Sequence, residues 1–254
     1  MSEEKTADIY LLGSGTFSFL DITLLTQHIL VEQCKTLYFL HDLPSLEKFL
    51  KKLVPNAENL LPIYYGEGKE RFEIYKNIVS HVIETDERKR PVALLLHGHP
   101  LVCSTLSRLL IQECENRGLA LEIVPAVSSL DRMFVDLKLD IFEYGVQILV
   151  AAAVVGQNIP LNPRLGCLLF QIGSLNTVAA RLASAKTEEV SQLRDYLLKF
   201  YPGHHMVKIV ESAVEIGFES RVVEIPLENL MKVCKFFNYN ASMYVPPLPT
   251  SPKL

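Results

Sequence analysis

Two tyrosines and one arginine are spaced so that their side chains could converge on one small polar group of a substrate. Arg71 and Tyr75 are four residues apart, so on a helix they lie one turn apart on the same face. Tyr65 precedes that helix on a loop that Gly66 and Gly68 loosen. Three hydrogen-bond donors in this arrangement suggest a site for a polar backbone.

The same segment has a second interpretation, in which it is an ordinary amphipathic helix. Helical spacing would then make a stripe of core residues from Phe72, Tyr75, Val79 and Val82. Arg71 would lie in solvent and would have no chemical role.

The elements that must position these side chains alternate between strands and helices through the first half of the chain. Apolar runs predict the strands, and amphipathic patterns predict the helices. The predicted strands are 9–12, 36–40, 92–96 and 121–124, and the predicted helices are 22–32, 46–53, 69–84, 102–117 and 132–135. This order is typical of a mostly parallel sheet covered by helices.

Three loops follow these strands at their carboxyl ends, where open sheets of this kind bind ligands. They are residues 13–15, 97–103 and 125–128. The Gly13-Ser14-Gly15 turn resembles a dinucleotide-binding loop but lacks the third glycine of that motif. A tight turn without any ligand explains it about as well.

The second half of the chain predicts a smaller lobe. Its predicted strands are 147–151, 167–172, 207–211 and 221–225, with a helix at 187–198. Small residues at Ala151–Ala153 would let a bulky ligand lie against a strand, but tight packing of a helix on a strand would use the same residues. Both interpretations are open at this point.

Composition limits the classes of function. The chain has 254 residues, 49% of them hydrophobic, which is enough to bury a substantial core. A formal net charge of -4 and a pI near 6.0 argue against a nucleic-acid-binding protein. No apolar run approaches the roughly 20 residues of a membrane helix, and the N-terminus lacks the features of a signal peptide. We therefore expect a cytosolic protein with neither a membrane nor a nucleic-acid partner.

The cysteines and histidines do not indicate a metal site or a disulfide framework. The five cysteines lack any C-x-x-C spacing. No carboxylate or cysteine stands at metal-ligand spacing beside the histidine pairs His97/His99 and His204/His205. We expect buried thiols and no bound metal.

Four motifs, taken in order, give the chain a resemblance to a known family. They are Leu12-Gly-Ser-Gly15, Gly98-His-Pro100, Pro125-Ala-Val-Ser128 and Val222-Val-Glu-Ile-Pro-Leu-Glu-Asn-Leu230. The set resembles the tetrapyrrole methylase family, whose members are S-adenosylmethionine-dependent methyltransferases. Within that family, Tyr65-x5-Arg71-x3-Tyr75 together with Gly98-His-Pro100 is similar to the borosin peptide backbone α-N-methyltransferases. The resemblance runs from about residue 8 to about residue 247.

The resemblance implies an α/β fold of two lobes, with a mostly parallel N-terminal sheet and a smaller mixed C-terminal lobe. The implied limits are 1–137 and 138–247, followed by a proline-rich tail at 248–254. The cofactor S-adenosylmethionine would be held between the lobes. Its implied binding residues are Gly13, Gly15, His99, Pro100, Val102, Cys103, Ser128, Ala151 and Gln171. By analogy with related methylases, the protein is expected to be a homodimer.

The motifs depart from the family pattern at a few positions. Leu101 and Cys103 replace the last glycine and the phenylalanine of Gly-His-Pro-Gly-Val-Phe, Ala126 replaces a glycine, and His97 stands where tyrosine is usual. The loss of a glycine matters if its backbone needed a positive φ or a close approach to the ligand. One alternative is therefore a protein that kept the fold and lost the chemistry, as a binding or regulatory subunit.

The chemistry that the resemblance implies is methylation of a peptide amide nitrogen. This nitrogen is a poor nucleophile because its lone pair is delocalised into the carbonyl. The enzyme must help to remove the N–H proton and stabilise negative charge on the carbonyl oxygen. Arg71 is expected to stabilise that charge, and Tyr65 or Tyr75, with a pKa lowered by the guanidinium, to accept or relay the proton. His97 is expected to hydrogen-bond the substrate, unless it is simply a satisfied strand-end histidine.

The source of the peptide is predicted from the last residues of the chain. Residues 244–254 are rich in proline, which cannot accept an N-methyl group because it has no N–H. We therefore expect the precursor peptide to be a separate chain, as in a split borosin. The alternative substrate is a tetrapyrrole or another small molecule, although a macrocycle carbon has no evident need for Tyr65, Arg71 and Tyr75.

Overall fold

The computed structural model describes residues 7–66, 68–175 and 185–249. The chain forms two compact units. Unit 1 contains the residues up to Arg132 together with Val214–Gly217, and unit 2 contains Met133–Ala213 and the residues from Phe218 onward. The sequence predicted a division between residues 137 and 138, and the compact units divide between residues 132 and 133. No pattern in the sequence indicated that residues 214–217 belong with unit 1.

Unit 1 is built on a five-stranded sheet in the order β3-β2-β4-β1-β5. Its strands are β1 Ile9–Gly13, β2 Thr36–Phe39, β3 Glu58–Asn59, β4 Val92–Leu96 and β5 Leu121–Ile123. All of these pairings are parallel, and Ile9 lies opposite both Val92 and Leu121. Because parallel strands point the same way, their carboxyl ends lie along one edge of the sheet.

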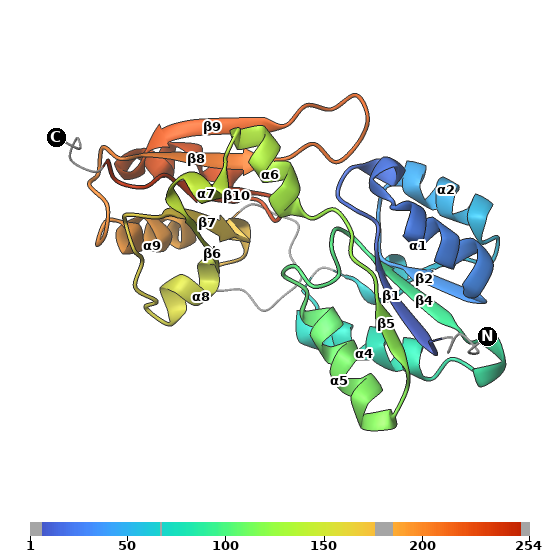
Figure 1. Ribbon diagram of the computed structural model, residues 1–254. Coiled ribbons are helices and arrows are strands. Elements are labelled where there is room, and N and C mark those ends of the chain that lie inside the picture. The colour runs from blue at the N-terminus through green and yellow to red at the C-terminus, as the bar shows by residue number, and fades with distance from the viewer. Residues whose placement is uncertain (1–6, 67, 176–184, 250–254) are drawn as a thin grey trace. The chain divides into compact units, whose positions relative to one another are not determined.

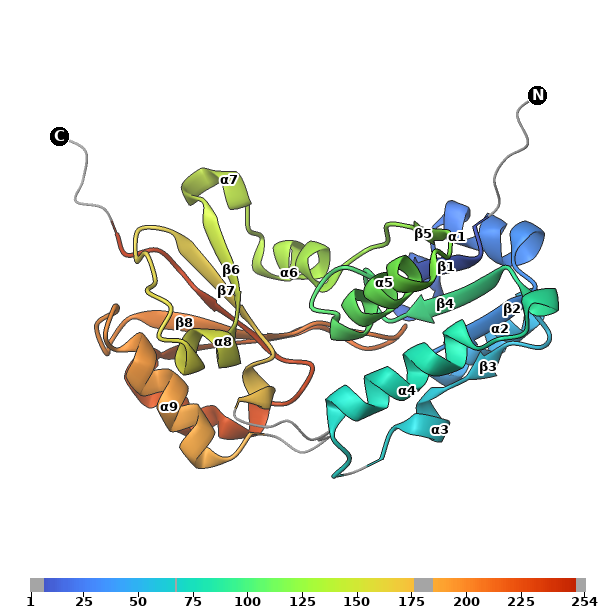
Figure 2. The same cartoon turned by 90° about the horizontal axis from the view of Figure 1, so that it is seen from below.

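Helices cover both faces of this sheet (Figures 1 and 2). One face carries α1 Leu24–His28, its π-helical continuation Ile29–Gln33, and α2 Pro44–Leu53. The other face carries α4 Arg71–Ile83 and α5 Thr105–Arg117, which pack against each other. Shorter helical segments are η1 Ser18–Asp21, α3 Leu61–Tyr64 and η3 Glu87–Lys89, and α6 Ser129–Leu137 contains the boundary between the two units.

The core of unit 1 follows from the alternation of side chains along its strands. Leu12, Phe39 and Leu95 share a buried cluster with Leu46 and Leu50 of α2. The intervening residues of the same strands point to the opposite face and are buried as well. A strand covered on both faces needs an apolar residue at each position, which explains the continuous apolar runs in the sequence.

Unit 2 contains a mixed sheet in the order β6-β7-β10-β8-β9. Its strands are β6 Val146–Val150, β7 Gly166–Phe170, β8 Met206–Glu211, β9 Arg221–Pro226 and β10 Ser242–Val245. β6 and β7 are parallel, and the other pairs are antiparallel. The helical segments are α7 Ile141–Tyr144, α8 Ala151–Gly156, η4 Ile172–Ser174, α9 Thr187–Leu197 and η5 Leu227–Phe236. In the part of the chain that the structure describes, no helix is long and apolar enough to span a membrane.

The predicted fold class is confirmed, whereas several element boundaries are wrong. α5 begins at Thr105 and not at 102, because the Ser104 side chain accepts a hydrogen bond from the Ser107 N–H and caps the helix there. Ala151 is the first residue of α8 and not the last residue of a strand. β10, the central strand of unit 2, was not predicted, and it overlaps the proline-rich segment 244–254. Residues 250–254 of the predicted tail lie outside the described residues.

Candidate functional site

The helices α3 and α4, which follow each other along the chain (Figure 2), position the side chains of Tyr65, Arg71 and Tyr75. Tyr65 is the residue that ends α3, and Arg71 is the first residue of α4. Tyr75 lies one turn further along α4, and its ring centroid is 6.5 Å from that of Tyr65. The Arg71 guanidinium interacts electrostatically with the Tyr65 phenol. The structure thus brings the three predicted groups together.

The core-stripe interpretation of α4 holds for only part of the helix. Ile78 and Val82 are fully buried, and they continue the line of Arg71 and Tyr75 along one helix face. Phe72 is 39% exposed and does not belong to the core. Tyr75 and Arg71 are half-buried. The buried stripe therefore stops where the polar pair begins.

The protonation of Tyr65 differs from the prediction. Burial, the charge of Tyr75 and a side-chain hydrogen bond with Tyr75 raise the pKa of Tyr65, while Arg71 lowers it by less. Arg71 thus acts in the expected direction, but the expected net lowering of the pKa is wrong for Tyr65, because desolvation of the phenolate outweighs the nearby positive charge. At neutral pH, Tyr65 is a neutral phenol that can donate a hydrogen bond.

The glycine turn after β1 is packed against the other two strand-end loops. A Cβ on Gly13 would lie 2.2 Å from the Gly98 carbonyl oxygen, 2.6 Å from the Ala126 Cβ and 2.9 Å from the Pro100 Cδ. The Gly98 N–H also donates a hydrogen bond to the Gly15 carbonyl oxygen, at 2.8 Å. The three loops selected by the strand-end rule therefore form one cluster. Gly13 has no side chain because this packing leaves no room for one.

Asp21, which sequence analysis missed, holds the residues after Gly15. Gly15 has a φ of 72°, and a Cβ there would lie 2.1 Å from the Asp21 Cβ. The Asp21 carboxylate accepts hydrogen bonds from the Thr16 and Phe17 N–H groups, at 3.0 and 2.9 Å. An acidic residue shortly after a glycine turn was the available signal in the sequence.

Ser128 and Asp131 fix the loop that follows β5. The Ser128 N–H and hydroxyl both donate to Asp131 Oδ2, at 2.7 and 2.6 Å. Burial acts to raise the pKa of Asp131, but these hydrogen bonds hold it below its usual value. Ser128 itself is 5% exposed. Asp131 therefore orders Ser128, the predicted binding residue.

The loop after β4 contains the other predicted donor-binding residues of unit 1. The Leu101 N–H donates to His99 Nδ1 at 3.0 Å, and the Val102 N–H donates to the His99 carbonyl at 3.1 Å. The Ser107 hydroxyl donates to the Pro100 carbonyl and ties the loop to α5. The loop is therefore a structured turn in which His99 is the principal acceptor.

The backbone conformation differs among the positions at which this chain departs from the family motifs. Leu101 and Ala126 are not among the described residues with a positive φ, so replacing glycine there costs no backbone strain. The Ala126 methyl also faces Gly13, which has no side chain. Cys103 does adopt a left-handed conformation, with a φ of 53°. Both glycine replacements are therefore compatible with the loop geometry.

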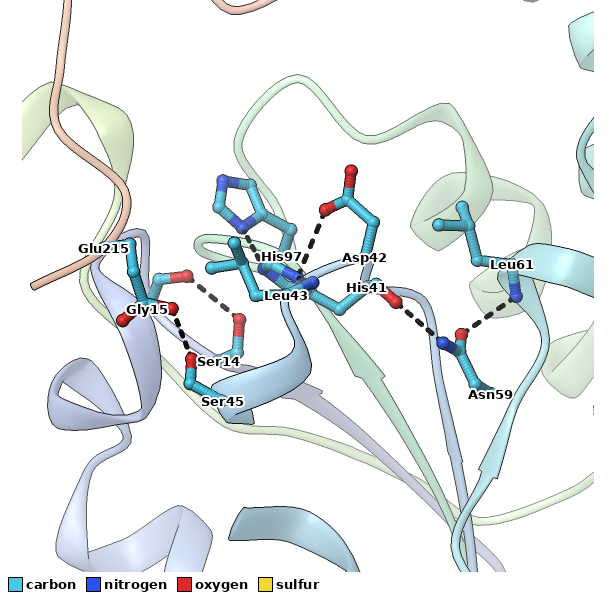
Figure 3. A network of polar contacts seen from close by, with 10 residues as sticks. All are labelled: Ser14, Gly15, His41, Asp42, Leu43, Ser45, Asn59, Leu61, His97 and Glu215. Carbon is cyan, nitrogen blue, oxygen red and sulfur yellow. Dashed lines mark hydrogen bonds and ion pairs between the residues drawn. The ribbon is translucent and has the colours of Figure 1, made fainter. Parts of the chain in front are cut away.

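His97 pairs with His41, a residue that sequence analysis did not single out (Figure 3). His41 Nε2 lies 2.9 Å from His97 Nδ1. Burial and the charge of His97 lower the pKa of His41 to about 4, although Asp42 and Glu215 act in the opposite direction. Part of the His97 residue is exposed to solvent. The surrounding protein still desolvates its ring, and this desolvation lowers the pKa of His97 as well. Both rings are neutral at neutral pH. Each histidine is the first polar residue after an apolar strand, which was the available signal.

The two predicted donor-binding residues of unit 2 follow neighbouring parallel strands. Val150 lies opposite Phe170, so Ala151 and Gln171 leave β6 and β7 side by side. Ala151 belongs to the buried core cluster, which favours packing as the reason for its small side chain. Gln171 has a left-handed conformation, with φ 56° and ψ 40°, which is uncommon for a non-glycine residue and concentrated at functional sites. Binding by these two residues stays a prediction.

Residues 8–228 match the family described as Tetrapyrrole (Corrin/Porphyrin) Methylases. The chain belongs to this family. The predicted family and the methyltransferase class that it implies are confirmed. The structure of uroporphyrin-III-C-methyltransferase from Thermus thermophilus has the same fold, with a TM-score of 0.67 at 16% identity over 94% of this chain and 93% of that chain. A second structure of the enzyme from that organism, complexed with S-adenyl homocysteine, has a TM-score of 0.59, also at 16% identity, over 94% of this chain and 92% of that chain. These two likenesses show that this chain shares its fold with that enzyme.

Curated relatives of this methylase-family chain carry the name borosin. One is the methyltransferase/ribosomally synthesized type II borosin cyclic peptide precursor of Phlebiopsis gigantea, 25% identical over 97% of this chain and 44% of its own length. A type I relative from Gymnopilus junonius is 27% identical over 98% of this chain and 59% of its own length. These matches confirm the resemblance to borosin methyltransferases. The chain spans about half the length of the curated relatives it matches.

Proposed function

We propose that this chain uses S-adenosylmethionine to methylate backbone amide nitrogens of a peptide. The observation that carries the proposal is the convergence of Tyr65, Arg71 and Tyr75 beside the carboxyl edge of the unit 1 sheet. The family membership supports the methyl transfer. The names of the curated relatives, which join a methyltransferase to a peptide precursor, support a peptide as the acceptor.

The cluster of strand-end loops in unit 1 suits the methyl donor. The donor combines a nucleoside, a sulfonium and an amino-acid chain, and such ligands need small residues for close approach and a few fixed polar groups. The loops meet at Gly13, Gly98 and Ala126, and Asp21 and Asp131 hold them in place. We propose that the donor is held by Gly13, Gly15, His99, Pro100, Val102, Cys103 and Ser128. The bound donor supplies an activated methyl group on sulfur.

Arg71 is assigned to the carbonyl oxygen of the acceptor amide. As the amide nitrogen loses its proton, negative charge moves onto that oxygen through the amide resonance. A guanidinium stays positively charged and offers several donors in a fixed fork. Arg71 stands at the first position of α4, where the free N–H groups of the helix also favour negative charge nearby.

The two tyrosines are assigned different roles, starting from the burial of Tyr65. Tyr65 is held as a neutral phenol, so it serves as a hydrogen-bond donor that orients the acceptor. The Tyr75 hydroxyl, on the same helix face as Arg71, is then assigned to relay the amide proton: it takes that proton as it passes its own to solvent water. Holding the amide between these groups is mainly a matter of proximity and orientation.

The source of the peptide and the assembly of the enzyme are separate proposals. The matched relatives are longer than the region that this chain covers. We keep the prediction that the precursor is a separate protein. We also keep the prediction of a homodimer, which light scattering at micromolar concentration tests and a monomeric mass would refute.

Two experiments test the proposed activity. Isothermal titration with S-adenosylmethionine and its demethylated product should show heat of binding, and none would indicate a subunit that kept the fold without the chemistry. A small protein that co-purifies with this chain should be the precursor. Its intact mass, measured by mass spectrometry, should then show the gain of one or more methyl groups. Transfer to a tetrapyrrole in place of any peptide would favour the small-molecule alternative.

A further inference from the structure

The two histidines at the edge of the unit 1 sheet are brought together by strand register. Phe39 of β2 lies opposite Leu95 of β4 in the parallel pair. His41 and His97 are each two residues further along, and side chains two residues apart lie on the same face of a strand. Their rings meet edge to face, with centroids 4.9 Å apart and an interplanar angle of 65°.

The hydrogen bonds of His41 determine where its proton lies. The Leu43 N–H donates to His41 Nδ1 at 3.0 Å. A backbone amide can only donate, so Nδ1 carries no proton, and the single proton of a neutral imidazole is on Nε2. The His41 side chain is 8% exposed, and the Asp42 side chain, whose Oδ1 lies 3.5 Å from Nδ1, is 70% exposed. The His41 ring is therefore a neutral Nε2–H tautomer.

The proton of His97 follows from that of His41. His41 Nε2–H points at His97 Nδ1 across 2.9 Å, so His97 Nδ1 must accept. Neutral His97 then carries its proton on Nε2. In Figure 3 this second nitrogen points away from His41. The pair thus presents one fixed N–H donor.

His41 itself is held from a third strand. Asn59 ends β3, and its side-chain amide donates to the His41 carbonyl oxygen at 2.7 Å. The Asn59 side-chain oxygen accepts from the Leu61 N–H at 3.1 Å. The chain of contacts therefore joins the carboxyl ends of β3, β2 and β4 (Figure 3). Asn59 fixes the His41 backbone, while the Leu43 N–H and His97 Nδ1 fix the two ring nitrogens.

We propose that His41 is a positioning residue that locks His97 as a hydrogen-bond donor for the acceptor peptide. A phenol carries its proton on its only oxygen, but an imidazole can place the proton on either nitrogen, and His41 removes that choice. His97 Nε2–H then donates to a peptide carbonyl, and His97 does not take the amide proton. This inference rests on the proposed peptide substrate, whereas the tautomer lock can be tested without any substrate.

The tautomer is tested by long-range ¹H–¹⁵N correlation spectra of the histidine-labelled full chain at neutral pH, with His97 assigned from a His97→Asn variant. We expect the Nε2–H form for both rings. His41→Gln, whose amide can still donate to His97, should keep that form, and His41→Phe should leave His97 as a mixture. An Nδ1–H His97 in the native chain, or an unchanged His97 in folded His41→Phe, would overturn the lock. If His41→Phe does not fold, the native spectrum and His41→Gln decide.

The role toward substrate is tested with a blocked synthetic peptide of valine, isoleucine and glycine. We expect His41→Phe to raise KM for the peptide by about tenfold, the loss of one hydrogen bond, with donor affinity unchanged and His41→Gln near native. A native peptide KM in folded His41→Phe would refute the positioning role. If the native chain methylates no peptide, the proposed function and the proposed role of His97 toward the substrate are both refuted. The spectra then remain the test of whether His41 fixes the tautomer of His97.

Discussion

The two sheets differ in how many chain segments they bring to one edge. In unit 1 all strand pairings are parallel, so the loops after β1, β2, β3, β4 and β5 share an edge. In unit 2 only β6 and β7 are parallel, and the antiparallel strands send their carboxyl ends in opposite directions. Most of the proposed chemistry therefore lies in unit 1, and unit 2 offers Ala151 and Gln171.

Strand direction decides where polar residues can accumulate in the two sheets. The edge of the unit 1 sheet collects the glycine turn, the His41–His97 pair and the Ser128–Asp131 pair. The two candidate residues of unit 2 are a buried alanine and one strained glutamine. Substitutions in unit 1 should accordingly cost more activity than those in unit 2.

The largest effect is expected at Arg71. Arg71→Ala should slow peptide methylation on the order of 10²- to 10³-fold, the usual loss for one oxyanion donor, with little change in donor affinity. Arg71→Lys should fail as well, because an ammonium cannot reproduce the planar fork. Lys76→Ala, which removes an exposed cation from the same helix, is the matched control. Near-native turnover in Arg71→Ala would contradict a catalytic role and would favour the alternative that Arg71 has no chemical function.

A second effect is expected in the pH dependence of stability. The pKa of His41 is about 4 in the folded chain and 6.5 ordinarily, so between these values the unfolded chain binds a proton that the folded chain does not. The free energy of unfolding should then fall as pH drops from 6.5 to 4, by up to about 3 kcal/mol from this group. Urea unfolding of native chain and His41→Gln across this window checks it. The variant should lose that part of the slope, and equal slopes would contradict a buried neutral His41.

The donor side of unit 1 is tested at Ser128. Ser128→Trp should weaken S-adenosylmethionine binding on the order of 100-fold, about 2.7 kcal/mol, because the indole cannot fit beside the packed loops. Isothermal titration measures the affinity, and a thermal unfolding curve establishes that the variant is folded. Unchanged affinity in a folded variant would remove the donor from this loop.

The smallest effect is expected in unit 2. Gln171→Ala and Gln171→Gly should each weaken donor binding by at most about tenfold, the loss of one hydrogen bond. Glycine also relieves the left-handed backbone, which costs roughly 1–2 kcal/mol in other residues. If Gln171→Gly binds the donor with native affinity and Gln171→Ala does not, donor binding depends on the backbone conformation at this position and not on the side chain. A loss greater than that of Ser128→Trp would reverse the ranking of the two units.

Local sequence patterns predicted unit 1 better than unit 2. Strands buried on both faces read as continuous apolar runs, and their order with the helices is enough to indicate a parallel sheet. β10 is only Ser242–Val245, next to prolines, and its central place depends on pairing with β7 and β8 from distant parts of the chain. Such long-range pairing leaves no periodic signal in a segment this short.

The candidate site was predictable in position but not in protonation. Arg71, Tyr75 and the strand-end loops follow from helix spacing and strand direction. The meeting of His41 with His97 depends on the register between two strands that are far apart in sequence. The raised pKa of Tyr65 depends on burial by the folded chain. Neither register nor burial can be read from residue types alone.

The most direct test of the proposed function offers the native chain a choice of acceptors. Isotopically labelled S-adenosylmethionine is supplied with the co-purified precursor peptide in one reaction and with a tetrapyrrole in another, and fragmentation mass spectrometry locates the label. We predict label on backbone nitrogens of the peptide, none on the tetrapyrrole, and almost none on the peptide with Arg71→Ala. Label on a peptide side chain or on the tetrapyrrole would contradict backbone N-methylation.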